Sequence, residues 1–166
     1  VMALLSESAE LWTHYIGLCL HPDYRISSKH ALRISNSLKT ICQSLFASCE
    51  EKEAGPLVKP LLNALTEARD EDRFVLVDAL CHVPCRYLPK KELPELSARL
   101  AAMLGTGNTE LDIITLHMLL RLPHAEQGLR PAVGAAVRQY APRWEDHLAH
   151  DWLKARLLAE PFAALD

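Results

Sequence analysis

Apolar residues recur along this chain at the three- and four-residue intervals of helices, and no stretch alternates convincingly with period two. Prolines and glycines interrupt the pattern where helices end, as at Pro22, Pro84, Gly105 and Pro123. Short loops separate the segments, so neighbouring helices are expected to run antiparallel. The pattern predicts an all-α chain of eight helices in four hairpins, at about residues 8–20, 28–49, 57–68, 70–83, 93–104, 109–122, 130–140 and 143–158.

The first two helices show which faces we expect to be buried. In the first, Leu11, Tyr15 and Leu18 have the i, i+4, i+7 spacing of a core-facing stripe. Residues 49–56, after the second helix, combine four charges with a glycine and a proline. We expect a linker there and a third helix that begins with Pro56 at or near its first position. The second helix carries its own stripe, made of Leu32, Ser35, Leu38, Cys42, Leu45 and Cys49.

Two segments of the chain match each other at an offset of 39 residues. A third, degraded copy keeps only a spacing of 15 residues between Val137 and Trp152. Leu80 and Leu119 occupy equivalent positions in the two better copies, so both are predicted to be fully buried. The matched positions are Leu65 and Leu104, Leu76 and Thr115, Leu80 and Leu119, and Val83-Pro84 and Leu122-Pro123.

The stretch from Gly55 to Pro84 resembles a HEAT repeat, in which a leucine-rich helix leads through an acidic and basic turn to a second apolar helix. Asp72 and Arg73 match the turn pair, and the helices match at Leu57, Leu61, Leu62, Leu65, Val77, Ala79 and Leu80. The resemblance covers about residues 56–160, and the second copy departs from it in having Leu111-Asp112 at the turn. It implies a HEAT-like right-handed superhelix, an α-solenoid of the kind that usually serves as a protein-binding scaffold.

A compact helical bundle is the alternative architecture. Sequential hairpins stack side by side in a solenoid, whereas helices distant in sequence meet in a bundle. The length of 166 residues suits a single all-helical domain. Val1 in place of an initiating methionine suggests a segment of a larger chain. We expect the apolar C-terminal residues Phe162 and Leu165 to fold back onto the last hairpin, or to contact a following repeat of the same chain or a second copy.

Composition and charge narrow the class of protein. Apolar residues make up 49% and charged residues 23%, which is typical of a soluble globular chain and not of a disordered one. A net charge of −3 gives no bulk attraction to nucleic acid or to membranes. The longest apolar run, from Ile113 to Leu122, is too short to span a membrane. Five cysteines spread over predicted helices indicate reduced thiols in a cytoplasmic or nuclear protein.

Charged residues of the second helices are the candidate binding positions. A basic residue recurs every four positions at the start of the helix at 28–49, which suits an acidic partner or phosphates but also an ordinary solvated face. In a HEAT-like superhelix the second helices line the concave surface, where their polar residues are expected to be exposed. The candidate partner-binding residues are Arg25, Lys29, Arg33, Arg73, Asp78, Asp112 and His117.

Two short motifs contain residue types that bind metals in other proteins. The segment CHVPC holds Cys81, His82 and Cys85, but a structural zinc site needs four ligands and no second Cys/His pair follows. Core packing and a turn explain this segment. Near the C-terminus, His147 and His150 share one helix face, a spacing that is common on solvated helices. We therefore expect no metal and no other cofactor.

Binding is the expected function, with another protein as the partner. The chain contains no nucleophile elbow, no P-loop and no dinucleotide-binding glycine motif. The alternative is a HEAT-like enzyme or nucleic-acid-processing domain with a concave active site, because some DNA glycosylases and pigment lyases are built on similar solenoids.

Overall fold

The computed structural model describes residues 9–24 and 28–140, and all regular structure in these ranges is helical. Seven α-helices are present there, which confirms the prediction of an all-α chain; the helix expected at 143–158 lies outside the described residues. None of the described helices is long and apolar enough to cross a membrane. The elements are α2 (Ala9–Cys19), η1 (Pro22–Tyr24), α3 (Ser28–Ser48), α4 (Glu51–Thr66), α5 (Asp70–Cys81), η2 (Cys85–Tyr87), α6 (Leu93–Met103), α7 (Thr109–Ala125), η3 (Gln127–Leu129) and α8 (Arg130–Tyr140).

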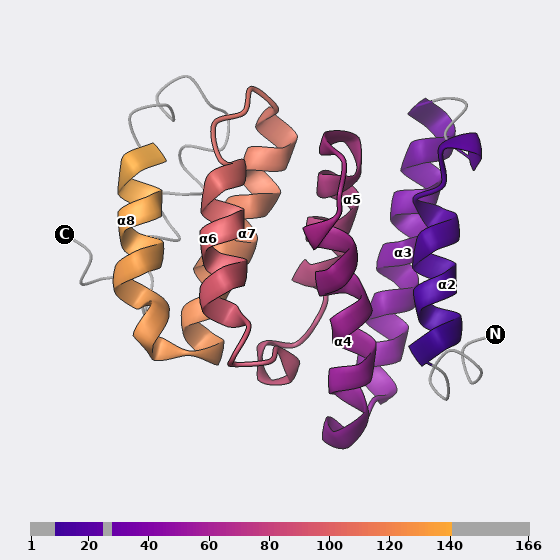
Figure 1. The fold of residues 1–166 in the computed structure, drawn as a ribbon, viewed down its shortest axis with the longest axis horizontal. Helices are drawn as coiled ribbons and strands as arrows, with labels where there is room; N and C mark the ends of the chain where they lie inside the picture. Colours follow the sequence, from indigo (N-terminus) through magenta and orange to yellow (C-terminus); the bar gives the residue numbers. More distant parts are fainter. Residues whose placement is uncertain (1–8, 25–27, 141–166) are drawn as a thin grey trace. The chain divides into compact units, whose positions relative to one another are not determined.

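The chain divides into two compact units, Val1–Leu88 and Pro89–Asp166. In the first unit α2 packs against α3 and α4, and α5 packs against α4 and α3 (Figure 1). The indole Nε1 of the buried Trp12 donates a hydrogen bond of 2.8 Å to the carbonyl oxygen of Leu57, which ties α2 to α4. Leu38, Cys42 and Leu45 of α3 are buried as predicted.

The buried face of α2 differs from the predicted one. Leu11 and Leu18 are 46% and 41% exposed, and the core side is formed by Trp12, Ile16 and Cys19 instead. Both sets have the i, i+4, i+7 spacing, and they differ by one residue, or about 100° around the helix. The contact between the buried Trp12 indole and Leu57 of α4 selects the second set.

The predicted linker before Pro56 is wrong, because α4 already begins at Glu51. The Glu50 backbone N–H donates to Glu53 Oε2 at 3.1 Å, which holds the start of the helix. Ala54 is buried, so the apolar stripe extends one turn further towards the N-terminus than the leucines alone indicate. Pro56 and Pro60 lie inside α4, as its sixth and tenth residues, where each lacks the N–H for one intrahelical backbone bond.

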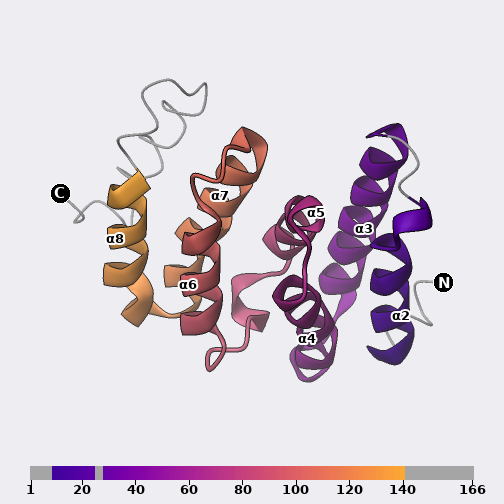
Figure 2. The same ribbon diagram turned by 45° about the horizontal axis from the view of Figure 1, so that its top comes forward.

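In the second unit α7 packs against α6 and α8 (Figure 2). The turn before α7 was predicted correctly: Gly105 has a φ of 75°, and the Asn108 side chain accepts the Leu111 N–H at 3.1 Å. The predicted end of α7 before Pro123 is wrong, because the helix continues through Pro123 to Ala125. In the last turn a proline removes a single hydrogen bond, and its buried ring contributes packing that offsets this loss.

Leu80 and Leu119, the positions matched by the 39-residue offset, are both fully buried. This confirms the prediction made for each of them. Leu80 belongs to the core of the first unit and Leu119 to the core of the second.

Candidate functional site

Of the basic stripe predicted at the start of the second helix, the structure describes one side chain. Arg25 lies outside the described residues, and Lys29 is placed only by its backbone, in the first turn of α3. Arg33 is exposed on α3. The stripe as a binding surface therefore stays a prediction.

Arg73 and Asp78 lie five residues apart on α5 and thus on different sides of that helix. The Arg73 guanidinium pairs with Asp70 Oδ1 at 2.9 Å. The Asp78 side chain is only 15% exposed, and its Oδ1 lies 3.7 Å from His82 Nε2, beyond direct hydrogen-bond length. These two candidates do not form a common surface within the first unit.

Asp112, expected to be exposed, is a buried residue of the second unit. Its Oδ1 accepts the Gly105 backbone N–H at 2.8 Å, and its Oδ2 accepts the Tyr140 hydroxyl at 2.6 Å. The carboxylate thereby joins the loop before α7 to the end of α8, and it is not presented on a binding surface. The other candidate on α7, His117, is half-buried.

The Cys/His-rich segment lies at the end of α5 and carries ordinary packing contacts. His82 Nδ1 is 3.1 Å from Gln43 Nε2, and Cys81 and Cys85 are half-buried reduced cysteines. Among the described residues no three His, Cys, Asp or Glu side chains are placed to hold a metal ion. Burial raises the pKa of the nearby Cys42 thiol to about 12, with further contributions from Asp78 and Cys19, so this thiol is protonated at neutral pH. His147 and His150 lie outside the described residues.

A hollow of about 380 Å³ between α2 and α4 is the best-built candidate site in the first unit. Each helix contributes a row of residues spaced i, i+3, i+4, i+7, which is one side of a helix. The turn between α4 and α5 closes one end of these rows. The lining residues are Thr13, Ile16 and Gly17 on α2 and Leu20 directly after it, Pro60, Asn63 and Ala64 on α4 and Glu67 at its C-cap, and Ala68, Arg69 and Asp72 at the closed end. We call this hollow the α2–α4 groove.

Small residues keep the middle of the groove open. A β-carbon added to Gly17 would meet no atom within 4 Å, so neither a tight contact nor its backbone requires glycine there. Inside a helix, glycine is less favourable than alanine by about 1 kcal/mol. Ala64 is the corresponding small residue on α4. The groove is therefore open where α2 carries no side chain.

Arg69 organises the closed end of the groove. Its Nε lies 3.0 Å from Asp72 Oδ2, and its two terminal nitrogens lie 2.9 Å from Glu71 Oε1 and 3.2 Å from the Leu20 carbonyl oxygen. Asp72 is buried beneath this guanidinium. The arginine thus holds the end of α2 against the start of α5, and it leaves the carboxylate of Glu67 exposed on the groove rim.

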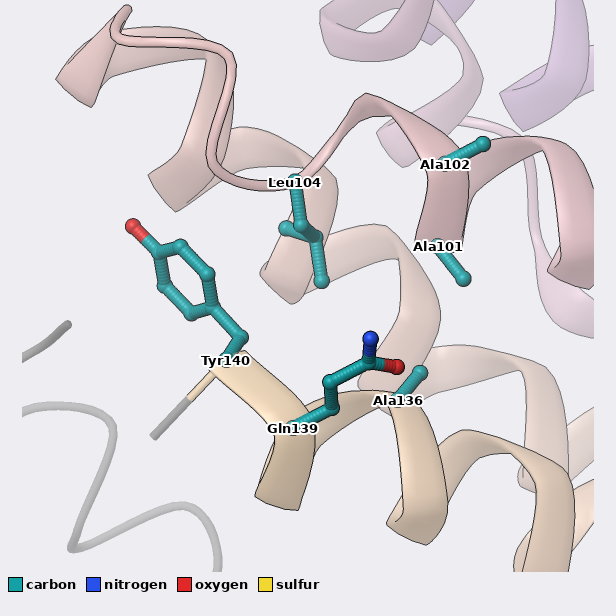
Figure 3. Close-up of a pocket in the computed structure, with 6 residues that line it drawn as sticks. All are labelled: Ala101, Ala102, Leu104, Ala136, Gln139 and Tyr140. Carbon is teal, nitrogen blue, oxygen red and sulfur yellow. The ribbon is translucent and has the colours of Figure 1, made fainter. Parts of the chain in front are cut away.

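A second hollow, of about 260 Å³, lies in the second unit between α6 and α8 (Figure 3). None of its lining residues is charged, and the hydroxyl of Tyr140 is bound to Asp112. The Gln139 amide supplies a donor and an acceptor there. This hollow offers little to distinguish one ligand from another. Its lining residues are Ala101, Ala102, Leu104, Ala136, Gln139 and Tyr140.

Sequence reasoning missed the α2–α4 groove, although two signals for it were present. Gly17 interrupts a helix that has no structural need of it, and Gly17 and Ala64 occupy the same place in two matching rows. Neither signal shows from the sequence alone which helices are neighbours.

The comparisons with known proteins found no relative. No family model, no curated protein and no solved structure matches this chain. The geometry of its own residues therefore carries the functional argument.

Proposed function

We propose that this chain is a protein-interaction module of the HEAT-like α-solenoid type, and that it binds a helical segment of a partner protein in the α2–α4 groove. The groove is the observation that carries the proposal. Its volume of about 380 Å³ leaves room for side chains of a bound segment.

The solenoid part of the proposal is supported by the resemblance to a HEAT repeat and by the packing within the first unit. There α2 lies against α4 and α3 against α5, so that first helices meet first helices and second helices meet second helices. Such pairing is expected of stacked hairpins. In the proposed right-handed superhelix the groove lies between first helices, on the convex side.

A helical segment is the ligand that the shape of the groove favours. The rows on α2 and α4 end together, with Leu20 and Glu67 beside the same Arg69, so the two helices run in the same direction along the groove. A third helix can lie along such rows with its own i, i+4, i+7 apolar side chains directed at Ile16, Gly17 and Ala64. The open middle accepts a leucine-sized side chain, and the polar ends set the register.

Filling the groove tests this proposal with a matched pair of variants. Gly17→Leu places a side chain in the groove, whereas Gly55→Leu makes the same change in α4 outside the groove residues. Both glycines are exposed, and neither has an atom within 4 Å of an added β-carbon, so both variants are expected to fold. A display library of amphipathic helical peptides is panned against the whole chain, and the affinities of the enriched peptides are measured by fluorescence anisotropy.

We expect the enriched peptides to bind Gly17→Leu at least about tenfold more weakly than the unmodified chain, a difference of about 1.4 kcal/mol. Their affinity for Gly55→Leu should be unchanged. Equal binding to both variants, or no enrichment over an unrelated helical protein, would show that the groove is not a peptide-binding site.

A further inference from the structure

The C-terminal ends of α2 and α4 place partial negative charge at the closed end of the α2–α4 groove. Both rows of the groove end there, where α2 finishes at Cys19 and α4 at Thr66. The C-terminal end of a helix carries a partial negative charge, and a basic residue in the last turn commonly balances it. Neither α2 nor α4 has a basic residue in its last turn.

Side chains add to this negative charge. Glu67 caps the C-terminal end of α4, a position at which the helix dipole disfavours a carboxylate, and it is exposed on the groove rim. Between residues 67 and 73 there are four acidic side chains and two basic ones. Asp70, Glu71 and Asp72 lie in the first turn of α5, where the helix dipole favours them, so Glu67 is the acidic side chain that adds to the negative end of α4.

The two basic side chains near this end are already paired within the chain. Arg69 contacts Glu71, Asp72 and the Leu20 carbonyl oxygen through all three of its nitrogens. Arg73 pairs with Asp70 on the exposed side of α5. Arg69 thereby already balances the C-terminal end of α2, and both arginines are engaged with groups other than Glu67, so a cation that balances Glu67 is supplied by the bound molecule.

We propose that the segment bound in the α2–α4 groove carries a lysine or arginine that pairs with Glu67, next to the apolar side chains that fill the groove. This inference rests on the proposed function and specifies the chemistry of the partner, namely an amphipathic helix with a basic residue at the end that meets Arg69. The pair lies on the rim, so it contributes selectivity and sensitivity to salt more than total affinity.

Paired peptides measure this preference directly. The best peptide from the library is made in two forms that differ only in lysine or glutamine at the position nearest the closed end. Both are titrated against the unmodified chain, against Glu67→Gln, and against Glu10→Gln as a control. Glu10 is an exposed glutamate in the first turn of α2, at the other end of that helix, and its substitution changes the net charge by the same amount.

We expect the lysine form to bind the unmodified chain about threefold to fivefold more tightly than the glutamine form at low salt. The preference should disappear in Glu67→Gln, persist in Glu10→Gln, and shrink as salt is raised. If binding depends on Gly17 while both forms bind equally, or while Glu67→Gln keeps the preference, the charge inference is wrong and the groove proposal stands. If no library peptide binds, or if Gly17→Leu leaves the affinity unchanged, both the groove proposal and the charge inference are wrong.

Discussion

Removal of the Asp112 carboxylate should destabilise the second unit more than any change to an exposed acidic residue. The side chain is 4% exposed, and each of its oxygens accepts one hydrogen bond within the protein. Asp112→Ala leaves the Gly105 N–H and the Tyr140 hydroxyl without this acceptor, in a place that the alanine side chain cannot fill.

The size of the effect follows from these two bonds. A hydrogen bond to a charged group contributes about 1.5–3 kcal/mol, so the loss of both should lower the free energy of unfolding by about 3 kcal/mol or more. Tyr140→Phe removes one bond and should lower it by about 1.5 kcal/mol. The effects should not add in the double variant, because the Tyr140–Asp112 bond can be lost only once; a coupling of about 1–2 kcal/mol is expected.

Urea unfolding followed by circular dichroism measures the free energies, and amide hydrogen exchange at Gly105 gives a local readout, since that N–H should exchange faster in Asp112→Ala. Asp70→Ala is the control: Asp70 also lies in the first turn of a helix, but its side chain is 91% exposed, and the change should stay within about 0.5 kcal/mol. Strict additivity of Asp112→Ala and Tyr140→Phe, or unchanged exchange at Gly105, would refute the role assigned to this carboxylate.

Three further predictions concern packing, thiol chemistry and helix propensity. Leu80→Ala and Leu119→Ala should each lower stability by about 2–5 kcal/mol in urea unfolding, whereas Leu11→Ala, at an exposed position, should change it by less than about 1 kcal/mol; equal losses at all three would contradict the burial pattern. Cys42 should resist alkylation in the folded chain at pH 8, because burial raises its pKa to about 12, and rapid labelling of Cys42 in peptide mapping would contradict this. The folded chain favours the neutral thiol, so this contribution to stability should be present below the ordinary pKa of about 9 and lost as the pH rises towards 12. Gly55→Ala should raise the melting temperature by an amount equivalent to about 0.5–1 kcal/mol, and a lower melting temperature would show that its β-carbon is not accommodated.

The existence and order of the helices could be predicted from spacing alone, because a core-facing helix must repeat its apolar residues every three or four positions. The orientation of α2 could not, since Leu11 and Trp12 begin equally good stripes and only the contact with Leu57 on α4 selects the second. The start of α4 was missed for a related reason. Charged residues before Pro56 suggested a linker, but the positive end of the helix dipole favours the acidic residue Glu53 in the first turn, and the helix continues through Pro56.

The candidate site was harder to predict than the fold, because polarity in a sequence does not distinguish a binding group from a structural one. In the sequence, Asp112 looks like any acidic residue in the first turn of a helix. Only its hydrogen bond from Tyr140 of α8 shows that the carboxylate has a structural role. The α2–α4 groove depends on rows from two helices that are separated by the whole of α3. Such a surface appears only once the neighbours are known.

Local departures from an optimal helix sequence meet at the α2–α4 groove. Gly105 and Gly107 have positive φ angles, so their turn requires glycine, but Gly17 lies inside a helix with room for a side chain. Glu67 likewise places a carboxylate where the dipole of α4 favours a cation. Gly17 makes the groove deeper and Glu67 makes its end negative, and neither residue is the one that helix stability alone would favour at its position. Both departures are consistent with the proposed binding role of the groove.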